Sequence, residues 1–385
     1  MRIGTRIVIF AAVLLTLATV APRGVPVLSA ASPVVTEGQG LLRRLVEGAK
    51  KEGQLDLMVV SSVGEKGGRE LTSAFKRRFG LDIQMNADIS GQESQKFNQA
   101  LAETKSGIPP TFDLMQGEPP VVLMLQRSGG LEPIENWEVL LAEIAPEGYK
   151  VKEKVSPKGV AGYGFVWANR ISGLLYNPKL ISERDLPKIW KDMGEPKYRG
   201  AFSLPPWTTI TLMGLIKYDK EAWLEVVKSW GKSKPQILTY DAGTQRMMLG
   251  DLKFLEANDY YYYEQKATDP NAPIGLTYFS DLAPMREVMY VVRKGTRHPN
   301  AAKLFALWAS SPEANSILEK YSYTQNTALG SGPITQQILK RLKTLNIKPV
   351  SWFDNPETLE KFLWLGTGEG QEYSRAIARA QREGT

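Results

Sequence analysis

The 385-residue sequence contains no cysteine and a single histidine. Without cysteine there are no disulfide bonds, no thiolate metal sites and no cysteine nucleophile. A Ser-His-Asp triad would have to use His298, and neither a Gly-x-Ser-x-Gly motif nor a P-loop is present. His298 precedes Pro299 in a polar stretch, so we interpret it as a surface turn residue. These absences argue against an enzyme and against a zinc site.

Long apolar runs are also absent, except at the N-terminus. Arg2 and Arg6 precede the apolar residues 7–20, and small residues then lead to Ala30-Ala31. This pattern is typical of a cleaved signal peptide, which we assign to residues 1–31, with cleavage after Ala30 as the second choice. A membrane anchor is the alternative, but the run is shorter than the ~20 residues that a spanning helix needs. Since no cysteine can carry a lipid tether, we expect a periplasmic protein.

The positive charge of the chain is modest. The formal charge is +7, and loss of Arg2, Arg6 and Arg23 with the signal peptide lowers it to +4. Lysine and arginine are scattered among acids, without a basic stripe or a nucleic-acid motif, so we expect no nucleic-acid partner. The excess is compatible with an anionic ligand. A mature chain of about 350 residues exceeds one ordinary core, so two lobes are expected.

Strands and helices alternate along the first part of the chain. Periodicity predicts strands at 55–60, 82–86 and 112–115. Helices are expected between and after them, at 69–79, 93–105 and 120–128. This alternation predicts an α/β fold with a mainly parallel sheet. Further strands are expected at 163–167, 171–176, 201–204 and 236–240, and the tail from 334 to 385 has a helical pattern.

Three blocks of sequence resemble one known family. Residues 289–315, MYVVRKGTRHPNAAKLFALWASSPEAN, read as a strand, a Lys-Gly turn and two helices that begin with proline. The other blocks are LLYNPKLISERDLPKIWKDMGEPKYRG at 174–200 and the early phrases EGAKKEGQLDLMVVSS and FDLMQG. Together they resemble periplasmic solute-binding proteins of ABC importers, in particular the ferric-iron-binding branch of the type II proteins. The resemblance extends from Leu41 to about Tyr323.

The resemblance implies a fold and a function. The expected fold is a two-lobed type II periplasmic binding protein with a hinge and an interlobe cleft. Lobe 1 would comprise residues 34–162 and 283–332, and lobe 2 residues 163–282 and 333–385. The protein would act as a monomer, close on a small solute and deliver it unaltered to the permease subunits of an ABC transporter.

A run of four tyrosines, in the phrase Asn-Asp-Tyr-Tyr-Tyr-Tyr, suggests a ligand. Ferric iron prefers anionic oxygen, which a tyrosine phenolate supplies once the metal displaces its proton. Iron-binding relatives carry Asn-x-Tyr-Tyr here, which implies Tyr260 and Tyr261 as metal ligands, with Fe³⁺ as transported solute and a synergistic anion. Alternatively, the tyrosines form an extended segment that packs on both faces. Many relatives also place a histidine in the first lobe; this chain has Glu65 near that position instead.

A second candidate site consists of segments between predicted strands and helices. Helix N-termini attract anions through free N–H groups and the helix dipole, and in α/β folds they lie beyond the carboxyl ends of the strands. Such a site suits a carboxylate, sulfonate or phosphonate, although each segment alone is an ordinary helix cap. Trp207 would stack on the ligand or fill the interface. The residues concerned are Ser61, Ser62, Ser90, Gly91, Trp207, Thr208, Thr209, Gly243 and Thr244.

The sequence therefore ranks ferric iron first and a small organic anion second. Two other roles stay open. One is a periplasmic enzyme on the same scaffold, using carboxylates such as Asp241 and Asp281. The other is the sensing subunit of a signalling complex, which would need the same capture and closure.

Overall fold

The computed structural model describes residues 36–385, and the predicted signal peptide, residues 1–31, lies outside this part. Within residues 36–385, no helix has both the length and the apolar character required to cross a bilayer. Residues 37–385 form one unit, to which everything below refers.

The elements up to the first long strand alternate between strand and helix, as expected. They are α1 (Glu37–Glu52), β1 (Gln54–Met58), η1 (Ser61–Val63), α2 (Gly64–Phe79), β2 (Gln84–Asp88), α3 (Glu93–Ser106), β3 (Leu114–Gly117), α4 (Pro119–Arg127), α5 (Trp137–Ile144), α6 (Pro146–Tyr149), α7 (Lys152–Val155) and β4 (Gly164–Tyr176).

The remaining elements include the tyrosine run and a helical C-terminal part. They are η2 (Glu183–Asp185), η3 (Trp190–Gly194), η4 (Pro196–Tyr198), β5 (Phe202–Leu204), α8 (Thr209–Leu212), η5 (Met213–Ile216), α9 (Lys220–Lys232), β6 (Gln236–Ile237), α10 (Tyr240–Leu249), β7 (Phe254–Asn258), α11 (Tyr260–Thr268), β8 (Gly275–Thr277), β9 (Ala283–Val292), α12 (Pro299–Trp308), α13 (Pro312–Ser322), α14 (Pro333–Thr344), β10 (Pro349–Val350), α15 (Pro356–Leu365) and α16 (Gly368–Glu383).

The strands join in the order β2-β1-β3-β9-β4-β7-β5-β6, with β10 beside β9 and β8 beside β4. Strands β1, β2 and β3 are parallel, as are β5, β6 and β7. The long strands β4 and β9 run antiparallel to each other and to their neighbours β7 and β3. The sheet is therefore mixed rather than mainly parallel, because two strands are shared between its halves.

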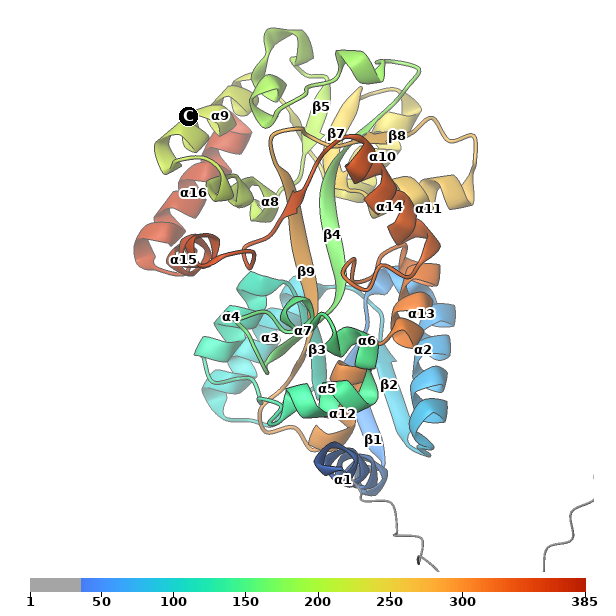
Figure 1. The fold of residues 1–385 in the computed structure, drawn as a ribbon. Coiled ribbons are helices and arrows are strands. Elements are labelled where there is room, and N and C mark those ends of the chain that lie inside the picture. Colours follow the sequence, from blue (N-terminus) through green and yellow to red (C-terminus); the bar gives the residue numbers. More distant parts are fainter. Residues whose placement is uncertain (1–35) are drawn as a thin grey trace, which may run out of the picture. The chain divides into compact units, whose positions relative to one another are not determined.

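Strand β4 connects two lobes. Its first part, residues 164–171, pairs with β9, and its second part, residues 172–176, pairs with β7. Figure 1 shows β4 and β9 running from the helices around β1–β3 to those around β5–β8. The sequence predicted two strands here; the structure has one continuous strand, with a register shift between Val166 and Ala168.

Each lobe has its own hydrophobic cores. In lobe 1, Phe75, Phe305 and Trp308 pack with ring centroids 5.0–5.4 Å apart. In lobe 2, Trp190 lies 4.4 Å from the ring of Phe279, and its indole N–H donates to the carbonyl of Leu282 at 2.7 Å. Both groups are fully or almost fully buried, so each lobe removes several aromatic rings from water.

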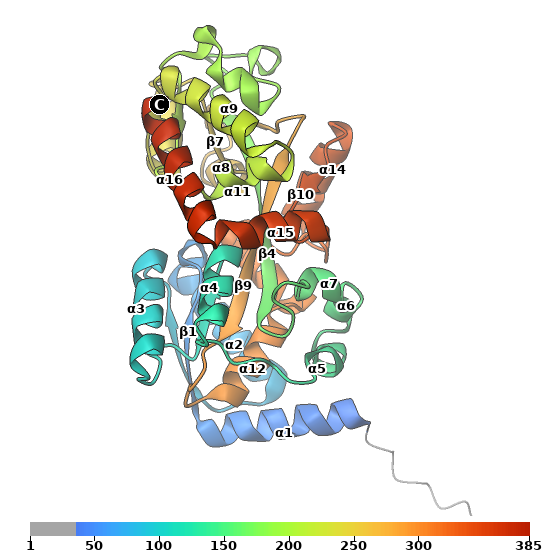
Figure 2. The same ribbon diagram turned by 90° about the vertical axis from the view of Figure 1, so that its left-hand side faces the viewer.

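The last helix completes the core of lobe 2. Helix α16 packs along α9, as Figure 2 shows, and buries Ile377 and Ala380. The buried side chain of Gln381 accepts a hydrogen bond from Thr211 at 2.8 Å and donates one to the carbonyl of Pro205 at 2.5 Å. This helix thereby fixes the segment that follows β5. The predicted lobe boundaries themselves stay a prediction.

Candidate functional site

The predicted residues of lobe 1 lie at the carboxyl ends of β1 and β2. Ser61 and Ser62 form η1, and a Cβ placed on Gly91 would lie 3.8 Å from the Cβ of Ser61. The structure thus brings these two loops together. The hydroxyl of Ser90 accepts a hydrogen bond from Lys96 at 2.9 Å. Glu65 instead faces solvent and pairs with Arg69 at 3.2 Å, one helical turn away.

In lobe 2 one prediction is wrong. Gly243 and Thr244 were expected to begin a helix, but α10 begins at Tyr240, and Thr239 caps it by accepting from the N–H of Ala242. The N–H of Gly243 already donates to the carbonyl of Thr239 at 2.8 Å, so it is not free for an anion. The sequence analysis placed the start of α10 too late because it extended the preceding strand to residue 240, whereas β6 ends at Ile237.

Trp207 and the two threonines after it lie where β5 leads into α8. Thr208 is the N-cap residue of α8, and Thr209 is its first residue. The ring of Trp207 meets Tyr240 edge-to-face at 5.0 Å, and 37% of Trp207 stays exposed. The exposed part of the indole is therefore available to a ligand, while its other part packs on the protein.

The tyrosine run is helical and not extended. Strand β7 ends at Asn258, and α11 begins at Tyr260. The rings of Tyr260 and Tyr261 are stacked, with centroids 4.5 Å apart, and the ring of Tyr240 lies 5.9 Å from that of Tyr261. Tyr260 and Tyr261, called the tyrosine pair below, therefore present two phenol groups at the carboxyl end of a central strand.

Both phenols of the tyrosine pair are hard to ionise without a metal. Burial raises the pKa of Tyr261 well above its usual range, and the charge of Tyr260 and hydrogen bonding to it raise it further, as does the carboxylate of Asp241. Burial also raises the pKa of Tyr260, while the cationic Arg170 and a hydrogen bond from Tyr261 oppose this. Asp241, in the first turn of α10 next to Tyr240, thus lies near the pair.

Two arginines lie next to the tyrosine pair, on neighbouring strands. Arg170 of β4 and Arg286 of β9 are partners in the strand register. Arg286 donates to both carboxylate oxygens of Glu118, at 2.6 and 2.7 Å, and to the amide oxygen of Asn258 at 2.6 Å. We call Glu118, Arg170, Asn258 and Arg286 the arginine cluster. It joins the end of β3 in lobe 1 to the end of β7 in lobe 2.

Arg170 is the less satisfied of the two arginines. Its guanidinium lies 3.9 Å from Glu118 and 5.6 Å from the ring centre of Tyr260. Its Nε, like that of Arg286, is buried and has no hydrogen-bond partner among residues 36–385. A buried donor without a partner is costly, so Arg170 favours an anion beside the tyrosine pair.

Two buried acidic residues, one in β7 and one directly after it, form hydrogen bonds with residues around the tyrosine pair. Glu256 of β7 accepts hydrogen bonds from Ser172 at 2.5 Å and from Tyr240 at 3.2 Å, and Asp259 accepts one from Tyr278 at 3.0 Å. Burial raises the pKa of Glu256 to about 7 and that of Asp259 to about 7. Both carboxyls therefore hold a proton more readily than an exposed acid does, and their hydrogen bonds position the aromatic rings of Tyr240 and Tyr278.

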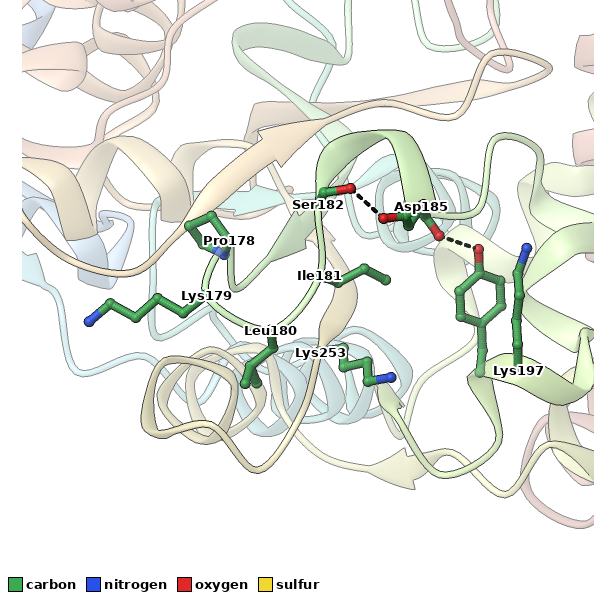
Figure 3. Close-up of a pocket in the computed structure, with 9 residues that line it drawn as sticks. Pro178, Lys179, Leu180, Ile181, Ser182, Asp185, Lys197 and Lys253 are labelled. Carbon is green, nitrogen blue, oxygen red and sulfur yellow. Dashed lines mark hydrogen bonds between the residues drawn. The ribbon is translucent and has the colours of Figure 1, made fainter.

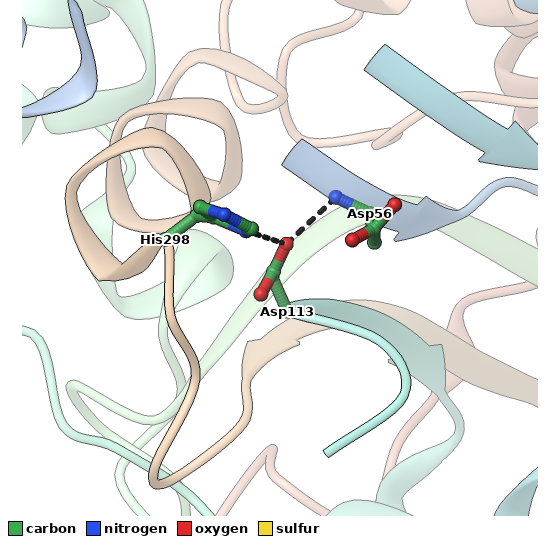
Figure 4. Close-up of side chains that lie close together, drawn as sticks. All are labelled: Asp56, Asp113 and His298. Carbon is green, nitrogen blue, oxygen red and sulfur yellow. Dashed lines mark hydrogen bonds and ion pairs between the residues drawn. The ribbon is translucent and has the colours of Figure 1, made fainter. Parts of the chain in front are cut away.

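Asp56 in β1, Asp113 just before β3 and His298 just before α12 lie close together (Figure 4), with potential metal-ligand atoms within 4.8 Å of one another. One oxygen of Asp113 accepts the N–H of Asp56 at 2.7 Å and lies 2.8 Å from Nδ1 of His298; the other accepts from Thr296. The group fastens β1, β3 and the start of α12 together. His298 lies at the helix start as expected, but its ring packs inward.

A cavity of about 430 Å³ lies on lobe 2, along the turn after β4 (Figure 3). Lys179, Lys197 and Lys253 border it, and Asp185 accepts a hydrogen bond from Ser182 there at 2.5 Å. Lys197 already pairs with Glu195 at 2.8 Å. Its lining differs from the tyrosine pair and the arginine cluster, so it forms no part of the candidate site.

The sequence profile of bacterial extracellular solute-binding proteins matches residues 70–336. The chain belongs to this family. The resemblance that the sequence suggested is thus confirmed, as is the two-lobed α/β fold. A search of curated protein sequences found no match to the chain.

Solved structures of solute-binding proteins share the fold at low identity. Iron-bound HitA from Pseudomonas aeruginosa is 20% identical, with a TM-score of 0.57 over 76% of this chain and 99% of HitA. AgtB from Agrobacterium tumefaciens R10, in complex with agropinic acid, is 15% identical (TM-score 0.60, 84% and 99%). The spermidine/putrescine protein PotD from Streptococcus pneumoniae is 14% identical (TM-score 0.61, 86% and 99%). At these identities the likeness establishes the fold and not the ligand.

The sequence analysis of this solute-binding protein missed the arginine cluster and the position of Asp241 near the tyrosine pair. A signal for the arginines existed. Arg170 interrupts the buried residues of β4, and Arg286 lies in β9, which is buried along almost all its length. A charge within such a strand needs a partner or a ligand. Glu118, the partner of Arg286, follows a different strand, so no sequence pattern could predict that these two residues pair.

Proposed function

We propose that the chain is the solute-binding component of an ABC importer and works in the periplasm. It captures a small solute between its lobes and delivers it unaltered to the permease. Family membership supports the class of function. The geometry supports a solute site between the lobes. Strands β4 and β9 connect the lobes, and the candidate residues lie near the part of these strands that passes from one lobe to the other. In this scheme the lobes move about these two strands.

We further propose that the solute is ferric iron, bound by Tyr260, Tyr261 and Asp241. The observation that carries this proposal is the stacked tyrosine pair beside a carboxylate at the end of β7. Two phenolates and one carboxylate supply three negative oxygens, which match a hard trivalent cation. Iron-bound HitA shares the fold, which is consistent with this role.

Arg170 fits a supporting role in iron capture. Its unsatisfied guanidinium lies beside Tyr260, where it would repel a bare cation but hold an anion that accompanies the metal. Such a synergistic anion would fill coordination positions that the protein leaves open. Ser61 and Gly91 of lobe 1 are candidates to contact it from the other side when the lobes close.

A paired set of variants tests the iron proposal. The double change Tyr260→Phe and Tyr261→Phe removes both phenolates and should abolish iron binding and the visible tyrosinate-to-iron band. The matched control changes Tyr262 and Tyr263 to Phe on the same helix and should keep both. Iron would be supplied as a citrate chelate, with metal content measured after gel filtration. Retained iron binding in the first variant would reject the proposal.

A small organic anion is the second candidate, and Arg170 together with the exposed edge of Trp207 favours it. A carboxylate could pair with Arg170 while its apolar body packs on the indole. The change Arg170→Gln should then abolish binding of the anion, whereas Tyr260→Phe with Tyr261→Phe should largely preserve it. Native mass spectrometry of the protein purified from its own periplasm would show which class of solute it carries.

A further inference from the structure

The second half of the tyrosine run borders a different cavity. This cavity, called the rear pocket below, has a volume of about 580 Å³ and lies between α11, α14 and the end of β4. Its lining differs from the tyrosine pair and the arginine cluster. The volume falls in the range of small-molecule sites, roughly 300–1,000 Å³. The residues that matter for its chemistry are Tyr176, Tyr262, Tyr263, Lys266, Lys340 and Arg341.

The charge of the rear pocket is positive. Lys266, Lys340 and Arg341 line it, and in the described part of the chain Glu183 is the one acid that does, which leaves an excess of two positive charges. Glu183 pairs with Arg341. The ammonium of Lys266 donates only to neutral carbonyls, those of Pro270 at 3.1 Å and Ala272 at 2.9 Å. No nearby carboxylate in the lining therefore balances Lys266.

Arg341 has hydrogen-bonding capacity left over. Its Nη2 contacts Glu183 and, at 3.4 Å, the carbonyl of Leu276. Its Nε is buried and has no hydrogen-bond partner within residues 36–385. An anion that reached this guanidinium would satisfy a donor that the protein leaves unpaired.

Aromatic and aliphatic groups form a large part of the remaining lining of the rear pocket. Tyr262 and Tyr263 meet edge-to-face at 5.1 Å, and Tyr176, Ile274 and Leu276 also line the pocket. Ring faces and edges of this kind suit a flat apolar body rather than a fully hydrated ion. The combination of basic groups with aromatic surface therefore selects for an organic anion.

We propose that the rear pocket is a second ligand site, which takes a small organic anion with a carboxylate on a planar apolar body. The family profile ends at residue 336, and the basic residues of α14 that line the pocket lie beyond it. The site is thus built partly from a segment outside the family match. It is separate from the proposed iron site, and it does not depend on iron being the solute.

The probe for this site is 4-fluorobenzoate, titrated into the mature protein and followed by fluorine NMR. It should bind saturably. The change Arg341→Gln should weaken binding about tenfold or more, as expected for a lost charge-assisted hydrogen bond. The matched control Lys343→Gln removes the same charge from an exposed position of α14 outside the pocket, and should leave affinity within about twofold. Tyr262→Leu should also weaken binding.

Three results would overturn the proposal. One is the lack of saturable binding by the wild-type protein. Another is equal weakening by Arg341→Gln and Lys343→Gln, which would indicate general charge attraction. The third is loss of binding on Arg170→Gln with retention on Arg341→Gln, which would place the probe at the arginine cluster. If Arg341→Gln does not fold, judged by circular dichroism, Lys340→Gln replaces it, with the same expected direction.

Discussion

Replacing Glu118 by glutamine tests whether the arginine cluster depends on its carboxylate. Arg286 donates to the two oxygens of Glu118 at 2.6 and 2.7 Å, and its side chain is only 6% exposed. Removing one partner of a buried ion pair costs about 3–5 kcal/mol. Because the side chain of Glu118 is 20% exposed, water replaces part of the interaction. We therefore expect the free energy of unfolding to fall by about 2–4 kcal/mol.

The measurement is urea unfolding at pH 7, followed by both circular dichroism and tryptophan fluorescence so that coincident transitions can be verified. The control is Glu132→Gln, which breaks a pair with Lys303 at 3.3 Å whose side chains are 35% and 21% exposed. A pair of this kind contributes at most about 1 kcal/mol. Sulfate should restore part of the lost stability to Glu118→Gln, because an anion can take the place of the carboxylate.

An effect of Glu118→Gln no larger than that of Glu132→Gln would refute this reasoning. It would mean that Arg170 and Arg286, partners in the register of neighbouring strands, tolerate each other without a neutralising acid. A loss of stability that sulfate does not reduce at all would show that packing, rather than charge, determines the effect.

Three further predictions concern titration and a second buried pair. Since the pKa values of Tyr260 and Tyr261 are raised, both phenols are protonated without metal, and ferric iron bound at the proposed site should release two protons. Its affinity should then fall by about 100-fold per unit of decreasing pH, measured by chelate competition. The pKa of Glu256 is raised from 4.5 to about 7, so the folded protein favours its neutral form. The free energy of unfolding should therefore fall by about 3 kcal/mol as the pH rises from 4.5 to 7. Urea unfolding of Glu256→Gln should show a smaller decline over this range. Glu103→Ala should cost about 3–5 kcal/mol in the same assay, because it leaves the buried Arg293, 3.2 Å away, without its anion.

Each of these has a contrary outcome. Release of one proton or none per iron, after correction for the chelate, would remove at least one phenolate from the site. A pH profile of Glu256→Gln parallel to that of the wild type would mean that this carboxyl titrates normally. A cost below about 1 kcal/mol for Glu103→Ala would show that the carbonyls of Ala100 and Gly130, to which Arg293 also donates, are enough to stabilise its charge.

The sequence predicted the elements that depend on local patterns. The helix from 93 and the strands near 55, 84 and 114 lie where periodicity placed them, because amphipathic spacing and turn residues determine them locally. The tyrosine run was harder to predict. Tyrosine favours strands in isolation, but residues 260–268 follow directly on β7 and form a helix, so tertiary context overrode propensity.

The candidate site was only partly predictable. The sequence indicated Tyr260 and Tyr261 through a local phrase, and their helix now shows both rings side by side. The arginine cluster joins residues 118, 170, 258 and 286, which no local pattern connects. It follows from strand order, since β9 lies between β3 and β4, and that order is a property of the whole sheet.

The way α16 completes lobe 2 affects how the chain folds as it is made. Ile377, Ala380 and Gln381 are buried in α16, and Gln381 bonds to Thr211 and Pro205, which were synthesised 170 and 176 residues earlier. The nascent chain therefore cannot complete this core until α16 has been synthesised. Until then, the part of lobe 2 that α16 covers in the folded protein stays uncovered.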